Sequence, residues 1–160
     1  LPLVRAGALT GFLELLEDRD IATDLYKMAG LLMMDIEDFF PLVEASDLLQ
    51  FTRVVEGDIE LTDQGRCFAQ ATVLERKEIF RQQLLSSIPM VKQMLQVLRA
   101  KANHEMNRDF FLDILMRTMG EKDALEQLDL LIGWERYAEL IAYDQDRDVI
   151  SLEDGADTIN

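Results

Sequence analysis

The chain has 160 residues and carries 16 Lys and Arg against 31 Asp and Glu, a formal net charge of −15. Because binding to nucleic acid or to an anionic membrane depends on Lys and Arg, this balance weighs strongly against both. No apolar run reaches the roughly 18 residues of a membrane span, and no segment resembles a signal peptide. One cysteine, Cys67, excludes an internal disulfide and favours a reducing compartment.

The first third of the chain predicts two helices before any strand. Residues 9–17 place apolar side chains at helical spacing, with Gly11 among them, and we expect this glycine to mark close packing. Thr23 is expected to cap a helix over residues 23–31. The apolar tract 31–34 that follows is interpreted as a turn packed into the core, the alternative being an exposed binding patch.

Residues 35–69 predict an acidic helix, a two-stranded hairpin and the start of another helix. Asp35 and Thr62 stand at positions where their side chains can cap the two helices, and Gly57-Asp58 turns the chain between the strands. With the preceding helix, this is the order of a winged helix, a fold that usually reads DNA with its second helix. Here that helix contains no Lys or Arg, so we interpret it as a protein-contact surface. Its candidate contact residues are Glu37, Asp38, Glu44 and Asp47.

The region from 63 to 101 predicts two long helices separated at Pro89, a residue suited to a first helical turn. From Arg66 to Lys101 there are seven basic and two acidic residues, so this segment carries +5 and the rest of the chain −20. Such segregation indicates basic helices lying against an acidic surface, within the molecule or in a partner; solvated faces are an equal alternative. The candidate contact residues here are Arg76, Lys77 and Arg81.

An apolar seam runs through the same helices at near-heptad spacing, through Phe80, Leu84, Ile88, Val91, Leu95 and Leu98. An intramolecular core is the favoured interpretation and a dimer seam the alternative. A second helix pair follows and leads into a second hairpin, with its turn at 144–147. Trp134 and Tyr137 lie at this joint, either as anchors of a protein contact or as core filling between helix and hairpin.

The predicted fold class is therefore mainly α with small β-hairpins. The expected architecture is a winged-helix lobe (1–70), a helical connector (71–101), a second, degenerate winged-helix-like lobe (102–153) and a disordered tail (154–160).

Catalytic and cofactor motifs are absent from the sequence. There is no GxxxxGK[ST], GxGxxG or GxSxG pattern, and the lone histidine, His104, has no partner at metal spacing, so we expect a surface loop there. Cys67 is interpreted as a buried structural thiol. Asp144, Asp146 and Asp148 alternate like calcium ligands, but the glycine and distal glutamate of a calcium loop are missing, so a hairpin turn is favoured. We expect no enzyme activity, no cofactor and no metal.

Several stretches together resemble one known family. They are Leu9-Thr-Gly-Phe-Leu-Glu-Leu-Leu-Glu, Asp24-Leu-Tyr-Lys-Met-Ala, Pro41-Leu-Val-Glu-Ala-Ser-Asp-Leu-Leu-Gln-Phe, Asp58-Ile-Glu-Leu-Thr-Asp-Gln-Gly-Arg-Cys-Phe-Ala, Glu75-Arg-Lys-Glu-Ile-Phe-Arg-Gln-Gln-Leu-Leu and Trp134-Glu-Arg-Tyr-Ala-Glu-Leu-Ile-Ala-Tyr-Asp. The chain resembles the AAA-associated C-terminal domain of the ATP-binding subunit of nitrate/sulfonate/bicarbonate-type ABC transporters, over residues 3–153. Leu32-Met-Met-Asp departs from that pattern, in which a glycine usually occupies the turn.

The resemblance implies a cytoplasmic domain, peripheral to the inner membrane through its transporter, with the nucleotide site upstream of Leu1. Its implied role is regulation or assembly through contacts with the ATPase domain or the permease subunits, with a homodimer as a further option. It offers no catalytic residues. Two alternatives stay open: a transcriptional regulator that meets DNA through the basic helices of 66–101, and a sensor of a small ligand or ion between the lobes.

Overall fold

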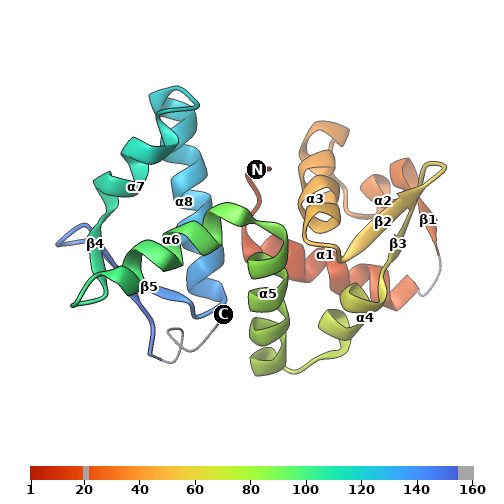
Figure 1. Ribbon diagram of the computed structural model, residues 1–160. Helices are drawn as coiled ribbons and strands as arrows, with labels where there is room; N and C mark the ends of the chain where they lie inside the picture. Colours follow the sequence, from red (N-terminus) through yellow and green to blue (C-terminus); the bar gives the residue numbers. More distant parts are fainter. Residues whose placement is uncertain (20–21, 155–160) are drawn as a thin grey trace. The chain divides into compact units, whose positions relative to one another are not determined.

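The computed structural model describes residues 1–19 and 22–154, and it is mainly α-helical with two small antiparallel sheets (Figure 1). At this level the predicted fold class is confirmed. The chain divides into two compact units, Leu1–Gln83 and Leu84–Asn160, and the boundary falls inside helix α5. The predicted tail lies almost wholly outside the described residues.

The described elements of the first unit are α1 (Ala6–Arg19), β1 (Thr23–Asp24), α2 (Leu25–Leu31), α3 (Ile36–Leu48), β2 (Thr52–Val55), β3 (Asp58–Leu61), α4 (Asp63–Gln70) and most of α5 (Val73–Ser87). Those of the second unit, drawn from green to blue in Figure 1, are α6 (Pro89–Ala100), β4 (Glu105–Asn107), α7 (Arg108–Leu115), α8 (Glu121–Tyr137), β5 (Ile141–Asp144) and β6 (Val149–Leu152).

Each hairpin is widened by a third strand that the sequence did not predict. The sheet orders are β1-β3-β2 and β4-β6-β5, all antiparallel, with Thr23 opposite Ile59 and Met106 opposite Ile150. The added strands are only two and three residues long. Such segments are too short to show the alternation from which a strand is predicted.

Both units therefore run helix, short strand, helix, helix, hairpin. At the strand-to-helix junction of each, an acidic or amide side chain caps the helix: Asp24 accepts from Lys27 N, and Asn107 accepts from Asp109 N. The cap expected at Thr23 is thus wrong by one residue. Thr23 belongs to the strand, whose pairing with Ile59 holds it in extended backbone.

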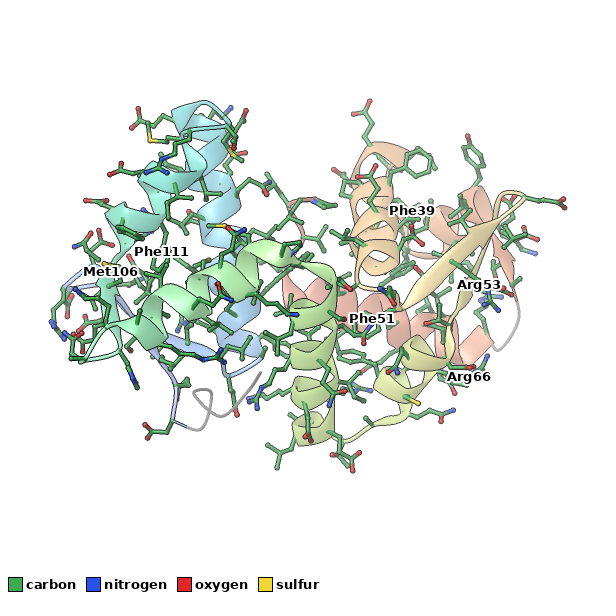
Figure 2. The ribbon with its side chains drawn as sticks, viewed as in Figure 1. Phe39, Phe51, Arg53, Arg66, Met106 and Phe111 are labelled. Carbon is green, nitrogen blue, oxygen red and sulfur yellow. The ribbon has the colours of Figure 1, made fainter. Side chains whose placement is uncertain are left out.

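Aromatic rings fill the core of the first unit. Phe51, at the entry to β2, contacts Phe68 of α4 (ring centroids 5.0 Å apart) and Phe80 of α5 (6.2 Å). Phe12 meets Phe39 edge-on, with ring centroids 5.7 Å apart. Phe39 and Phe51 are labelled in Figure 2. All five are buried. Each fully buried ring contributes about 1.5–3 kcal/mol through the hydrophobic effect.

One glycine is required by this packing. A Cβ on Gly65 would lie 1.9 Å from the carbonyl oxygen of Phe51, so the start of α4 approaches the chain before β2 too closely for any side chain. Thr62 fixes that approach, because its hydroxyl accepts from Gly65 N (3.1 Å) and donates to Gln50 O (2.6 Å). The predicted Thr62 cap is confirmed.

Between residues 63 and 101 the chain forms three helices where two were predicted. The predicted break at Pro89 is present, but a further break separates α4 from α5. Thr72 and Glu75 form a reciprocal capping box there, with Thr72 N donating to the Glu75 carboxylate and Glu75 N donating to the Thr72 hydroxyl. All six seam residues from Phe80 to Leu98 are buried within the single chain, which confirms the intramolecular core.

Three packing predictions are wrong. Gly11 faces open space rather than a packed neighbour. Leu31 and Met33 of the 31–34 tract are exposed, Met33 by 93%, whereas Leu32 and Met34 are partly buried in the turn that follows the end of α2 at Leu31. Cys67 is exposed, since α4 buries the face that carries Gly65, Phe68 and Ala69.

Candidate protein-contact surfaces

The outer face of α3 combines acidic and apolar side chains. At about 100° per residue, one stripe of the helix surface collects five exposed residues, the α3 stripe: Glu37, Phe40, Glu44, Asp47 and Leu48. The opposite face carries the buried Phe39, Leu42, Val43 and Ser46. Asp38 is exposed but lies about 120° around the helix from Glu44, so it is the one predicted acidic contact residue outside the stripe.

The carboxylates of the α3 stripe have no ion-pair partner within the described part of the chain. Neither Glu37, Glu44 nor Asp47 forms an ion pair or a side-chain hydrogen bond there. Phe40 and Leu48, each 37% exposed, stand among them. At its C-terminal end the stripe borders a shallow groove of about 410 Å³, whose lining includes Asp47 and Arg53, the latter paired with Glu60.

Two acidic residues of α1, Glu14 and Glu17, behave differently, because basic side chains of the same unit pair with them. Arg76 donates to Glu14 and also to the carbonyl oxygens of Phe68 (3.0 Å) and Ala69 (2.6 Å), and its side chain is only 15% exposed. Arg66 lies 4.0 Å from Glu17. For these two arginines, basic helices do lie against an acidic surface within the molecule.

The other predicted contact residues are less exposed to solvent than a contact role requires. Lys77 and Arg81 are partly buried, and each has an interaction within the structure. Trp134 is fully buried in α8, as the core-filling alternative requires, and Tyr137 is partly buried at the end of the same helix. The structure therefore groups three of the nine candidate residues into one open surface, the three acids of the α3 stripe.

Corresponding positions in the two units hold different polar groups. Phe51 N bonds to Ser46 O and Leu140 N to Glu135 O, so Ser46 of α3 corresponds to Glu135 of α8. The buried Ser46 hydroxyl lies 2.9 Å from the Thr52 hydroxyl and also donates to Val43 O. Glu135 is equally buried, but neither carboxylate oxygen has a hydrogen-bond partner among the described residues. Burial raises the pKa of Glu135 well above its ordinary value, because it disfavours the charged form of the carboxyl group.

The second hairpin is held by its own polar groups. The Asp144 carboxylate accepts from Asp146 N and Arg147 N, which makes it a turn residue. Tyr143 donates to Asp148, and this hydrogen bond raises the pKa of Tyr143. Among residues 1–19 and 22–154 there is no group of three or more His, Cys, Asp or Glu placed to hold a metal ion. Nor does any helix in this part of the chain have the length and apolar character to cross a membrane.

Comparison with known proteins identifies the family. The family model described as the C-terminal AAA-associated domain matches residues 26–144, about three quarters of the chain. The chain belongs to this family. Searches of curated proteins and of solved structures gave no match. The match to the C-terminal AAA-associated domain starts in α2 and ends in β5, so it includes the whole α3 stripe and elements of both units. The family's description points to a domain attached to an ATPase.

The break between α4 and α5 has a signal in the sequence. Thr72-x-x-Glu75 is the pattern of a capping box and marks the start of α5. The exposure of Met33 and Cys67 had no such signal, because apolar residues in short segments are usually core.

Proposed function

We propose that the chain is a non-catalytic regulatory or assembly domain attached to the ATP-binding subunit of an ABC transporter of the nitrate/sulfonate type. In this proposal it lies in the cytoplasm, peripheral to the inner membrane through its transporter, and acts through contacts with the ATPase domain or the permease subunits. Membership in the C-terminal AAA-associated domain family supports the attachment to an ATPase. The transporter type rests on the sequence resemblance described above.

The observation that carries the contact role is the charge of α3. The order of strand, two helices and hairpin supports interpreting each unit as a winged-helix lobe, and α3 then takes the place of the helix that reads DNA. That helix exposes unpaired carboxylates and contains no Lys or Arg. Since phosphate contacts need cations, a surface of this charge favours a protein partner.

The basic segment gives little support to DNA binding. Arg76 already donates to Glu14 and to two backbone carbonyl oxygens, so it would have to leave these partners to meet phosphate. The seven cations of 66–101 are also distributed over three helices, α4 to α6, and the loop after them.

The test is co-purification of the chain with the ATPase domain encoded in the same reading frame, together with light scattering on the chain alone. We expect a complex with the ATPase domain and a change in its rate of ATP hydrolysis. A chain that stays monomeric and associates with neither the ATPase domain nor the permease would contradict the proposal. A salt-sensitive, sequence-dependent gel shift with duplex DNA would replace it with the regulator alternative.

A further inference from the structure

Exposed apolar side chains gather on the α2–α3 segment of the first unit. Five of the large hydrophobic residues that are exposed in the described chain lie between residues 26 and 48: Tyr26 (68% exposed), Leu31 (44%), Met33 (93%), Phe40 and Leu48. Two of them belong to the α3 stripe, and Met33 lies three residues before α3 begins at Ile36. Phe40 and Leu48 share one stripe of a helix, and exposed apolar residues on one face mark a contact site more often than scattered residues do.

Met33 occupies its position at a local cost. Its φ is +56°, in the left-handed region that glycine adopts without strain and a side chain such as methionine rarely adopts. The side chain makes no compensating core contact, because it is almost wholly exposed. The left-handed residue closes α2, because Met33 N donates to Gly30 O and Met34 N donates to Ala29 O, and a glycine would serve this turn without exposing an apolar side chain.

The second unit supplies an internal comparison. Helix α8, which corresponds to α3, exposes Glu121, Lys122, Asp123, Asp129, Gly133 and Arg136, a set of mixed charge without any large apolar residue. Asp129 is also paired, with Arg108 at 2.7 Å. The combination of unpaired carboxylates and apolar side chains is thus a property of α3 and not of the repeated fold.

We propose that the α3 stripe, extended by Met33, is the docking surface for a basic amphipathic helix of the protein to which this domain is attached. Apolar side chains of that helix meet Met33, Phe40 and Leu48, and its Lys or Arg residues meet Glu37, Glu44 and Asp47. Charge complementarity selects this occupant, because a second copy of a chain with net charge −15 would bring like charges together. This inference rests on the proposed function and names its surface and partner chemistry.

The probe is a fluorescent synthetic helix with Leu on one face and Lys on the other, titrated into the chain and followed by anisotropy at about 0.15 M salt. Two further peptides are controls: one with Lys replaced by Glu, and one with the Leu/Lys composition scrambled. The first variant neutralises the stripe (Glu37→Gln, Glu44→Gln, Asp47→Asn). Its matched variant removes three exposed carboxylates of the second unit (Asp113→Asn, Glu121→Gln, Asp123→Asn), so that both carry the same net charge.

We expect the Leu/Lys helix to bind, the stripe variant to bind about tenfold more weakly and the matched variant to bind as the wild type does. Met33→Gly separates binding from folding, because it relieves the left-handed strain while removing an apolar anchor. It should raise the melting temperature and weaken binding several-fold.

Several outcomes would overturn the assignment: equal weakening in both charge variants, equal binding of the scrambled peptide, no binding at all, or a dimer of the chain that the stripe variant abolishes. If the stripe variant still co-purifies fully with the ATPase domain, the surface is wrong while the proposed function stands. If the wild type fails to co-purify, the function itself fails.

Discussion

The carboxyl group buried at Glu135 makes the stability of the second unit depend on pH. Its side chain is 0% exposed, and neither carboxylate oxygen has a hydrogen-bond partner among the described residues. Replacing it by the isosteric, uncharged glutamine removes the proton equilibrium and keeps the volume. The difference in unfolding free energy between Glu135→Gln and wild type should therefore change with pH.

The sign and the size follow from proton linkage. Burial raises the folded-state pKa, whereas the unfolded chain ionises Glu135 near the ordinary value of 4.5. As the pH rises above 4.5, the unfolded state loses this proton first, so wild type loses stability relative to the variant. The difference between the variant and wild type should grow by about 1.4 kcal/mol for each pH unit between the ordinary pKa of 4.5 and the raised folded-state pKa.

The assay is urea denaturation at a series of pH values, followed by fluorescence. Trp134 is the single tryptophan of the chain and is buried next to Glu135 in α8, so its emission reports on the second unit. Glu121→Gln, at an exposed position of the same helix, is the control and should show no such trend. A difference between Glu135→Gln and wild type that stays constant with pH would refute the reasoning.

Three further substitutions test the packing of the first unit. Gly65→Ala should destabilise this unit by about 3 kcal/mol in urea denaturation, because the new Cβ meets the Phe51 carbonyl group. Gly11→Ala, at a position in open space, should stabilise it by up to about 1 kcal/mol. Similar effects of the two substitutions would contradict the close approach of Gly65 to Phe51. Arg76→Met should cost about 2 kcal/mol by the same measurement, since the carbonyl oxygens of Phe68 and Ala69 each lose a charged donor. Arg147→Met, at a 60% exposed ion pair, should change stability by less than about 1 kcal/mol, and equal losses would rule out the buried role of Arg76. Thr72→Ala should lower the melting temperature through loss of the α5 cap, by about 1 kcal/mol of stability, and an unchanged melting temperature would show that the capping box is dispensable.

Local sequence patterns were enough to predict the main helices, the two hairpins and most of the buried core residues. Leu9, Phe12, Leu13 and Leu16 are buried as their spacing predicts, and Pro89 begins α6. Such features are set by interactions between near neighbours, which the order of residues encodes directly. The acidic character of α3 was visible in the same way.

Long-range packing decided the rest. The third strand of each sheet exists because β1 and β4 find partners about 36 and 44 residues away in the chain, which no local pattern records. Whether Met33 is core or surface depends on where α2 ends against α3, and whether Arg76 is free depends on Glu14 of a distant helix. The sequence by itself determined the elements and the charge of the candidate surface; only the tertiary structure decided which carboxylates keep their charge free, because pairing requires groups that folding alone brings together.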